Sequence, residues 1–289
     1  MSVLPPDWAR YLTLDEARAL RETEEWVHAP QGLLGRALAL ASRPLDAAYQ
    51  AVPAGLREAL GEAIYKVLNG LLEGSRYTVN PRALWDRLSA DVGHDVSSFQ
   101  QVFKLDLAVL DRAAQDSLRA HRAAAAVEGG ATGFMGLVGL VADVPALYGL
   151  LFRTIQEISI YYGFPVDSAA EKSHILKVLD VGHYLEDSSR RQGMLELASI
   201  QEMIHQGVPL KDAERLFLAK GLQQLARELA LDLTRRKLGQ TLAVVGSVVG
   251  AGMNYQLVTD VGQTAYHAYR RRHLMHLALA RMAAREGRR

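Results

Sequence analysis

Three charged residues in the middle of the chain stand among apolar ones, at spacings that bear on acid–base chemistry. Arg153 and Glu157 are four residues apart, so on a helix they share one face and can form an ion pair. Asp143 precedes Pro145 and is placed to cap the helix that follows. Because Asp143 and Glu157 are separated by about 21 Å on a continuous helix, a general acid–base dyad requires a sharp bend at Pro145. We interpret Asp143, Arg153 and Glu157 as a structural polar cluster. The alternative is a hydrolase-type site in which Asp143, Glu157 and His183 lie in a pocket under the glycine-rich segments described below.

Other catalytic and metal-binding chemistries find little support in the sequence. The chain has no cysteine, which excludes thiolate catalysis and disulfides. His183 with Asp187, and His273 with His276, have the spacing of two ligands on one helical face, but neither pair has an HExxH motif or a third ligand nearby. No GxxxxGK[ST] or GxSxG motif is present. We therefore predict neither a metal nor a cofactor.

Positive charge is concentrated at the C-terminal end, where Arg270, Arg271 and Arg272 are consecutive. Residues 263–289 contain seven Arg and one acidic residue, Glu286, which gives 7 − 1 = +6 and leaves 1 − 6 = −5 for the rest of the chain. Clustered arginines favour an anionic membrane surface or an acidic partner, and the alternative interpretation is a solvated helix end. A sequence pI near 8.0 is low for nucleic-acid binding, so no nucleic-acid partner is predicted.

Two apolar segments are unusually rich in glycine. The first repeats glycine every three residues, and the second has GxxxG spacing. The glycines predicted to pack helices are Gly130, Gly133, Gly136, Gly139, Gly246 and Gly250. Since each glycine costs a helix about 1 kcal/mol relative to alanine, this density requires compensation, which close helix packing provides. We predict that the two segments form a central pair of apolar helices.

Neither segment has the uninterrupted apolar length of a bilayer span, which is about 20 residues. Residues 133–152 are long enough but include Asp143 and Pro145, and residues 241–253 are too few. Buried helices of a soluble fold are therefore favoured. The alternative is a shallow, hairpin-like insertion with the arginine-rich tail at the level of the lipid headgroups.

Helical signals dominate the remaining sequence. Thr13 with Glu16, and Ser168 with Glu171, have the spacing of capping boxes, in which each side chain satisfies the other residue's backbone N–H. Apolar residues recur at helical spacing from 96 to 127 without proline or glycine, which predicts one long helix there.

Composition and periodicity together predict the fold class. Hydrophobic residues make up 49% and aromatic residues 7% of the chain, and few runs alternate with the period of a strand. We predict an all-α, multi-helix bundle around the pair of glycine-rich helices. Residues 1–50 are expected to form an N-terminal helical extension, and residues 51–289 the main helical domain.

Two stretches carry a family resemblance. Residues 126–164 resemble the central signature of the EcsC protein family, an EG-x-x-TG opening followed by a G-x-x-DxP-x-L-like element and a helix ending in YG. The matching positions are Glu128, Gly129, Thr132, Gly133, Asp143, Pro145, Leu147, Tyr162 and Gly163. Residues 244–272 resemble the closing motif, a VG-x-x-VGA-like turn followed by Asn, a VG pair and a basic helix. Residues 1–50 have no counterpart in this comparison.

The resemblance implies kinship without a reaction, because the family takes its name from a protein encoded beside the subunits of an ABC transporter. Residues 1–10 contain two prolines and no apolar core of signal-peptide length, so the cytoplasm is the predicted location. We expect a non-catalytic accessory protein that associates peripherally with the cytoplasmic face of the membrane or with a membrane complex. A homo-oligomer is compatible with this expectation. The alternatives are the hydrolase described above and a soluble protein-interaction or scaffold module.

Overall fold

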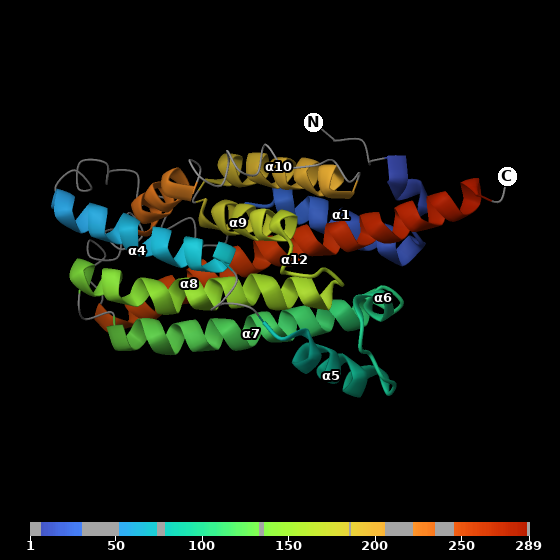
Figure 1. Cartoon of the computed structure of the whole chain (residues 1–289), viewed down its shortest axis with the longest axis horizontal. Helices are drawn as coiled ribbons and strands as arrows, with labels where there is room; N and C mark the ends of the chain where they lie inside the picture. Colours follow the sequence, from blue (N-terminus) through green and yellow to red (C-terminus); the bar gives the residue numbers. More distant parts are fainter. Residues whose placement is uncertain are drawn as a thin grey trace.

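The computed structural model describes residues 7–30, 52–73, 79–132, 136–184, 186–205, 222–234 and 246–287. Every regular element within these ranges is a helix, which confirms the predicted all-α class. In chain order they are η1 (Asp7–Tyr11), α1 (Leu14–His28), α4 (Ala54–Glu73), α5 (Pro81–Val92), α6 (Phe99–Val102), α7 (Leu107–Thr132), α8 (Gly136–Tyr161), α9 (Ala169–His183), α10 (Asp187–His205) and α12 (Gly246–Glu286). Residues 222–234 are also helical. Figure 1 shows the helices packed into an elongated bundle.

The longest helix, α12, runs along most of this bundle. It has 41 residues, so it extends for about 60 Å. It packs against α7, α8, α9 and α10, and also against η1 and α1 (Figure 1). Leu257, Val261 and Tyr269 on α12 are fully buried in the main hydrophobic core, together with residues of α4, α7, α8 and α9. The bundle is therefore assembled around α12.

Local capping signals are confirmed at one site and changed at the other. The Thr13 backbone N–H donates to the Glu16 carboxylate at 2.8 Å, and the Glu16 N–H donates to the Thr13 hydroxyl, so the predicted capping box is present. At the second site Ser168 accepts from the Glu171 N–H at 3.2 Å, as predicted. The Glu171 carboxylate, however, pairs with Arg272 on α12. A tertiary ion pair thus replaces half of the second box.

The prediction of one uninterrupted helix over residues 96–127 is wrong. Ser98 caps the short helix α6, and the chain then turns before α7 begins at Leu107. Asp106 accepts a hydrogen bond from the Ala108 N–H at 3.1 Å, which satisfies a free donor at the start of α7. Two short polar side chains therefore divide a stretch whose apolar periodicity is continuous.

Pro145 neither ends nor begins a helix, contrary to the expectation that Asp143 caps a new one. Helix α8 is continuous from Gly136 to Tyr161 and contains Pro145. Asp143 lies inside α8, seven residues after Gly136, where the backbone N–H groups are no longer free to be capped. Pro145 is the tenth residue of α8, so it lies in the helix interior, where it donates no backbone hydrogen bond, and its ring is exposed.

The N-terminal segment packs tightly on the end of α12. Trp8 and Leu20 are buried against Leu274 and Met275 in a second, smaller hydrophobic cluster. Arg281 on α12 forms a bidentate ion pair with the Glu16 carboxylate, with distances of 2.5 and 2.7 Å. The domain boundary at residue 50 stays a prediction, but η1 and α1 are packed into the same body as the helices after residue 51.

The predicted glycine-rich pair falls largely outside what the structure describes. Gly130 lies in the last turn of α7, Gly136 and Gly139 begin α8, and Gly246 and Gly250 begin α12. Gly133 and the surroundings of the other five glycines lie outside the described residues. The mutual packing of the two segments therefore stays a prediction.

The helix register nevertheless relates the two segments. Asp111 on α7 contacts Arg270 on α12, and Leu118 lies against Gly262, so the two helices are antiparallel. Continuing this register about 12 residues further along α7 reaches Gly130 at the level of Gly250. The two glycine-rich segments thus belong to the same end of the bundle. Within the described ranges, no helix has the length and hydropathy that a membrane span requires.

Close helix packing on glycine is found at two other positions. Gly182 is the last residue but one of α9, and a Cβ added there would come within 2.6 Å of the Val261 Cα on α12. The next residue of α12, Gly262, faces the Leu118 side chain of α7, which a Cβ would overlap. Helix α12 therefore passes close to α9 on one side and to α7 on the other, and glycine permits both approaches.

We predict that Gly182→Ala destabilises the protein by about 2 kcal/mol or more, because the new methyl group meets the backbone of α12 and the two helices must separate. Gly252→Ala on α12 is the matched control, since a Cβ there has nothing within 4 Å. It should stabilise the helix by up to about 1 kcal/mol. Urea unfolding followed by circular dichroism measures both. Equal stability of the two variants would contradict the close α9–α12 contact.

Candidate functional site

The predicted ion pair between Arg153 and Glu157 is present, and it belongs to a cluster that joins α7 to α8. The Arg153 Nε donates to the Glu157 carboxylate at 2.8 Å, and the Ser117 hydroxyl donates to the other carboxylate oxygen at 2.7 Å. His121 Nε2 lies 3.6 Å from the same oxygen. The Glu157 side chain is only 5% exposed, so a buried carboxylate is held by partners from both helices.

The hydrogen bonds in this cluster define the state of His121. The Thr154 hydroxyl donates to the Leu150 carbonyl, so it must accept from His121 Nδ1, at 2.8 Å. Burial lowers the pKa of His121; the Glu157 carboxylate opposes this shift and the Arg153 guanidinium adds to it. The Ser117 proton points to Glu157 rather than to the histidine, so no base activates this hydroxyl as a nucleophile. The cluster is built to join two helices.

The three residues of the hydrolase alternative do not converge. Asp143 and Glu157 lie on one continuous helix, so the rise of the helix separates them by about 21 Å, beyond the reach of shared proton transfer. His183 is fully buried, its Nδ1 donates to the Leu179 carbonyl at 2.8 Å, and its Nε2 is 3.2 Å from the Tyr148 hydroxyl. Both ring nitrogens therefore have hydrogen-bond partners inside the protein. Asp143, Glu157 and His183 do not form the common site that the hydrolase hypothesis requires.

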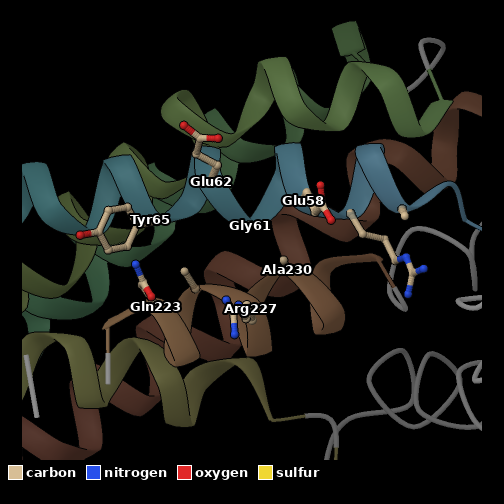
Figure 2. Close-up of a pocket in the computed structure, with 10 residues that line it drawn as sticks. Glu58, Gly61, Glu62, Tyr65, Gln223, Arg227 and Ala230 are labelled. Atoms are coloured by element: carbon tan, nitrogen blue, oxygen red, sulfur yellow. The ribbon is translucent and has the colours of Figure 1, made fainter. Parts of the chain in front are cut away.

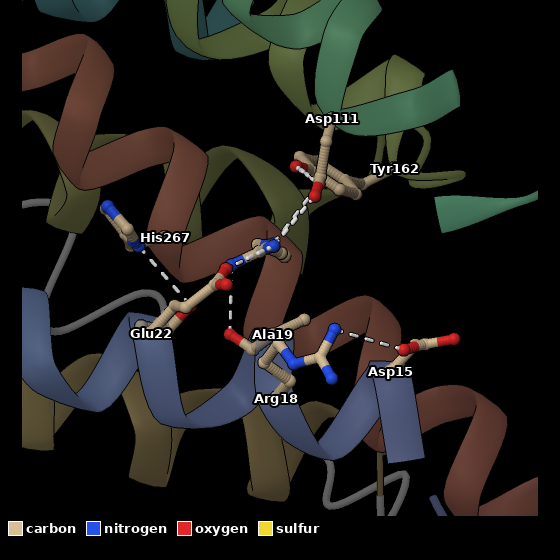
Figure 3. Close-up of polar contacts among 9 residues, drawn as sticks. Asp15, Arg18, Ala19, Glu22, Asp111, Tyr162 and His267 are labelled. Atoms are coloured by element: carbon tan, nitrogen blue, oxygen red, sulfur yellow. Dashed lines mark hydrogen bonds and ion pairs between the residues drawn. The ribbon is translucent and has the colours of Figure 1, made fainter. Parts of the chain in front are cut away.

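Arg270 lies inside the protein, contrary to its predicted role at an anionic surface. Its guanidinium makes a bidentate ion pair with Asp111 on α7 and a second ion pair with Glu22 on α1, at 2.8 and 2.9 Å (Figure 3). It also donates to the Ala19 carbonyl at 2.9 Å, and Asp111 accepts from the Tyr162 hydroxyl at 2.5 Å. Burial opposes the charge, but the Asp111 carboxylate raises the pKa of Arg270 above its ordinary value.

The other two arginines of the triplet also have internal partners. Arg272 forms a bidentate ion pair with Glu171 on α9, at 2.5 and 2.6 Å, and both side chains are about 7% exposed or less. Arg271 donates to the Gln201 side chain at 3.3 Å, and its guanidinium lies 5.5 Å from the centre of the Trp8 ring. The three arginines point to different neighbouring helices because successive residues on a helix are rotated by about 100°.

Arg270 and Arg272 are paired with carboxylates inside the protein, which argues against a membrane or anion contact at these two residues; for Arg271 the predicted contact stays a prediction. A buried guanidinium that already binds a carboxylate cannot turn to a headgroup without leaving an unpaired charge inside the protein. Of the seven arginines of the tail, Arg270, Arg272 and Arg281 pair with acidic residues of distant helices.

We predict that Glu171→Gln destabilises the protein by about 3 kcal/mol or more, because Arg272 then keeps a buried, uncompensated charge. The double variant Glu171→Gln with Arg272→Met removes that charge and should recover most of the loss. Glu62→Gln, in the exposed Glu62–Lys66 pair, is the control and should leave the stability nearly unchanged. Urea midpoints of the four proteins measure this, and a double variant no more stable than Glu171→Gln contradicts it.

Two buried histidines of α12 belong to the same packed region. His267 stacks on Trp26 of α1 with 4.2 Å between ring centroids, and its Nδ1 is 3.3 Å from the Thr23 hydroxyl. Burial, helped by the Arg270 charge, lowers the pKa of His267 to about 3. His273 donates from Nδ1 to the Tyr162 carbonyl, and burial lowers its pKa to about 4. Both histidines are therefore neutral in the folded protein at neutral pH.

These shifts predict an acid-sensitive fold. Unfolded histidine takes up a proton below about pH 6.5, while the folded protein binds it only near pH 4 or 3, so stability is complete above pH 6.5 and falls as the pH drops. Each histidine contributes a slope of about 1.4 kcal/mol per pH unit. His267→Gln should reduce the slope of unfolding free energy between pH 6 and pH 5 by that amount. An unchanged slope, measured by urea unfolding at each pH, would show that His267 does not cause the acid sensitivity.

A groove lies between α4 and the helix at residues 222–234. Polar side chains that take no part in the contacts of the core line it. Its volume is about 500 Å³, within the usual range of ligand pockets. The lining residues are Ala54, Arg57, Glu58, Gly61, Glu62, Tyr65, Gln223, Ala226, Arg227 and Ala230. Figure 2 shows the two helices on either side of it. Sequence analysis missed the groove, although small residues four apart beside charged ones, at 226 and 230, indicate an open helix face.

No group of three or more His, Asp or Glu side chains within the described ranges is arranged to hold a metal ion. His183 and Asp187 are on different helices, α9 and α10. The ring of His276 stacks on Phe103 at 4.0 Å between centroids, and His273 is held by a backbone carbonyl. The histidine pairs singled out in the sequence thus have packing partners in this fold.

Comparison with known proteins places the chain in a family. The EcsC protein family matches residues 17–274. An uncharacterized Bacillus subtilis protein, YdbA, is 25% identical over 267 residues, which cover 90% of this chain and 93% of that protein. Protein EcsC of Bacillus subtilis is 29% identical over 182 residues, which cover 63% of this chain and 69% of its own length. No solved structure matches.

The chain belongs to the EcsC protein family, since the match extends over most of its length. The match includes α1 from residue 17 onward and α12 to residue 274, so it contains both partners of the Arg270 ion pairs and of the Arg272 ion pair. Part of the segment before residue 50, for which the sequence analysis found no counterpart, is thus included in the family match.

Proposed function

We propose that this protein is a non-catalytic accessory protein that associates peripherally with the cytoplasmic face of the membrane or with a membrane complex. Membership of the EcsC family supports the proposal through the kinship with a transporter-associated protein that the sequence motifs imply. The contact would be made by the end of the bundle where the glycine-rich segments lie. Arg270 and Arg272 take no part in it.

The observation that carries the proposal is an apolar end of the bundle. Val127 near the end of α7 is 75% exposed, and Tyr255 near the start of α12 is 39% exposed. Following the antiparallel register from Leu118 and Gly262, Val127 is within about two residues of the level of Tyr255. The two exposed apolar side chains lie at the same end of the bundle, where contact with lipid or with another protein would cover them. The apolar glycine-rich sequences begin directly beyond these two residues.

The internal pairing of charges supports the non-catalytic part of the proposal. Glu157, Glu171 and Arg270 are shielded from solvent, and each is engaged by its own partner: Arg153, Arg272 and Asp111, respectively. Groups that act in acid–base catalysis need access to a substrate. These ion pairs instead set the positions of α1, α7, α9 and α12.

Flotation with lipid vesicles and with inverted cell membranes tests this proposal. The wild-type protein should float with at least one of them and resist a high-salt wash, because apolar contacts are not screened by salt. Val127→Glu with Tyr255→Glu should reduce the floating fraction about tenfold, since two apolar contacts are lost. Flotation with cell membranes alone would indicate a protein partner, and flotation with pure lipid a direct contact.

Leu14→Glu is the matched control for the flotation experiment. Leu14 is 87% exposed, and it lies near Glu16, which pairs with Arg281 about 50 Å along α12 from Gly246. This variant adds the same charge at the opposite end of the bundle and should float like the wild type. A wild-type protein that stays with the soluble fraction in both preparations would overturn the proposal. An equal loss of flotation in the Val127→Glu/Tyr255→Glu variant and in Leu14→Glu would show that the contact surface is not at Val127 and Tyr255.

A further inference from the structure

The groove between α4 and residues 222–234 has two walls that carry opposite charges on unengaged side chains. Glu58 comes from α4 and Arg227 from the facing helix (Figure 2). Neither forms an ion pair or a hydrogen bond within the part of the chain that the structure describes, and the same is true of Gln223 and Tyr65. The groove thus presents the Glu58 carboxylate on the α4 wall and the Arg227 guanidinium on the opposite wall, and both are open to a ligand.

The floor of the groove is made of small residues. Ala226 and Ala230 on the helix at residues 222–234 are almost fully buried. A Cβ added to Gly61 on α4 would have nothing within 4 Å. The space at Gly61 is therefore not filled by packing. Small side chains leave room for a short aliphatic portion of a ligand between the two polar walls.

The balance of charge in the lining indicates which ligand fits. The lining has four charged residues, Arg57, Glu58, Glu62 and Arg227. Glu62 is paired with Lys66 at the exposed edge, at 2.9 Å, and Arg57 has a partner of its own, so the unengaged charges are Glu58 and Arg227, 1 − 1 = 0. A simple anion would leave Glu58 uncompensated and repelled, and a simple cation would do the same to Arg227. A ligand that carries both charges satisfies both walls.

We propose that this groove binds a zwitterionic phosphoester that has an ammonium group and a phosphate a few bonds apart, as in glycerophosphoethanolamine. The ammonium group pairs with Glu58, and the phosphate accepts from the Arg227 guanidinium and the Gln223 amide. The glycerol and methylene carbons lie in the open space beside Gly61. The same chemistry is available in a soluble molecule and in the headgroup of a membrane lipid. This site is independent of the proposed membrane contact at Val127 and Tyr255, so either can fail alone.

Calorimetric titration of the full chain with three probes tests the charge requirement. Glycerophosphoethanolamine should bind saturably at millimolar concentration or below, while glycerophosphate and ethanolamine, which each carry one of the two charges, should bind at least about tenfold more weakly. Vesicles with and without phosphatidylethanolamine, used in the same titration, distinguish a headgroup from a soluble ligand. Absence of zwitterion binding in both forms, or preference for glycerophosphate, would overturn the proposal.

Two pairs of variants test the location. Gly61→Leu fills the groove, whereas Gly55→Leu, on the same helix but outside the lining and also with open space at Cβ, leaves it empty. Arg227→Gln removes the phosphate partner, and Glu228→Gln changes the charge of the next residue outside the lining. We expect about tenfold weaker binding for Gly61→Leu and Arg227→Gln only. Binding that is equally strong in all four folded variants would place the ligand elsewhere and refute the assignment.

Discussion

The structure depends on how closely α12 can approach its neighbours. At Val261 and Gly262 it passes between α9 and α7: Gly182 lets the backbones of α9 and α12 come together, and Gly262 leaves room for the Leu118 side chain of α7. Because van der Waals attraction falls off over a fraction of an ångström, such a contact is lost when the helices separate even slightly. The positions of α7 and α9 relative to each other are thus set through two adjacent residues of a third helix.

The same proximity explains why so much charge is buried. About two to three turns beyond the glycine contacts, α12 carries Arg270 and Arg272, whose side chains enter the spaces beside α7 and α9 and meet Asp111 and Glu171. Buried ion pairs of this kind contribute little net stability, since desolvation offsets the attraction, but a displaced helix would leave a charge without its partner. Apolar contacts therefore supply the stability, and the ion pairs restrict the register in which the helices can pack.

The groups that hold the helices together and the groups that are exposed to a partner lie in different parts of the bundle. At the end occupied by η1 and α1, polar groups of several helices are joined by ion pairs, aromatic stacking and backbone contacts, and little remains for an external ligand. Unengaged groups occur elsewhere: apolar side chains at Val127 and Tyr255, and opposite charges across the groove at Glu58 and Arg227.

Features decided within a few residues of sequence were predictable, since their physics is local. The all-α class, the Thr13 capping box, the Arg153–Glu157 pair and the family motifs required only spacing and residue type. What the tertiary structure decided involves partners far apart in the chain: Arg270 meets Asp111 over 159 residues, and Arg272 meets Glu171 over 101. A sequence shows that an arginine is charged. It does not show whether a carboxylate lies beside that arginine inside the protein, because this depends on which helices pack together.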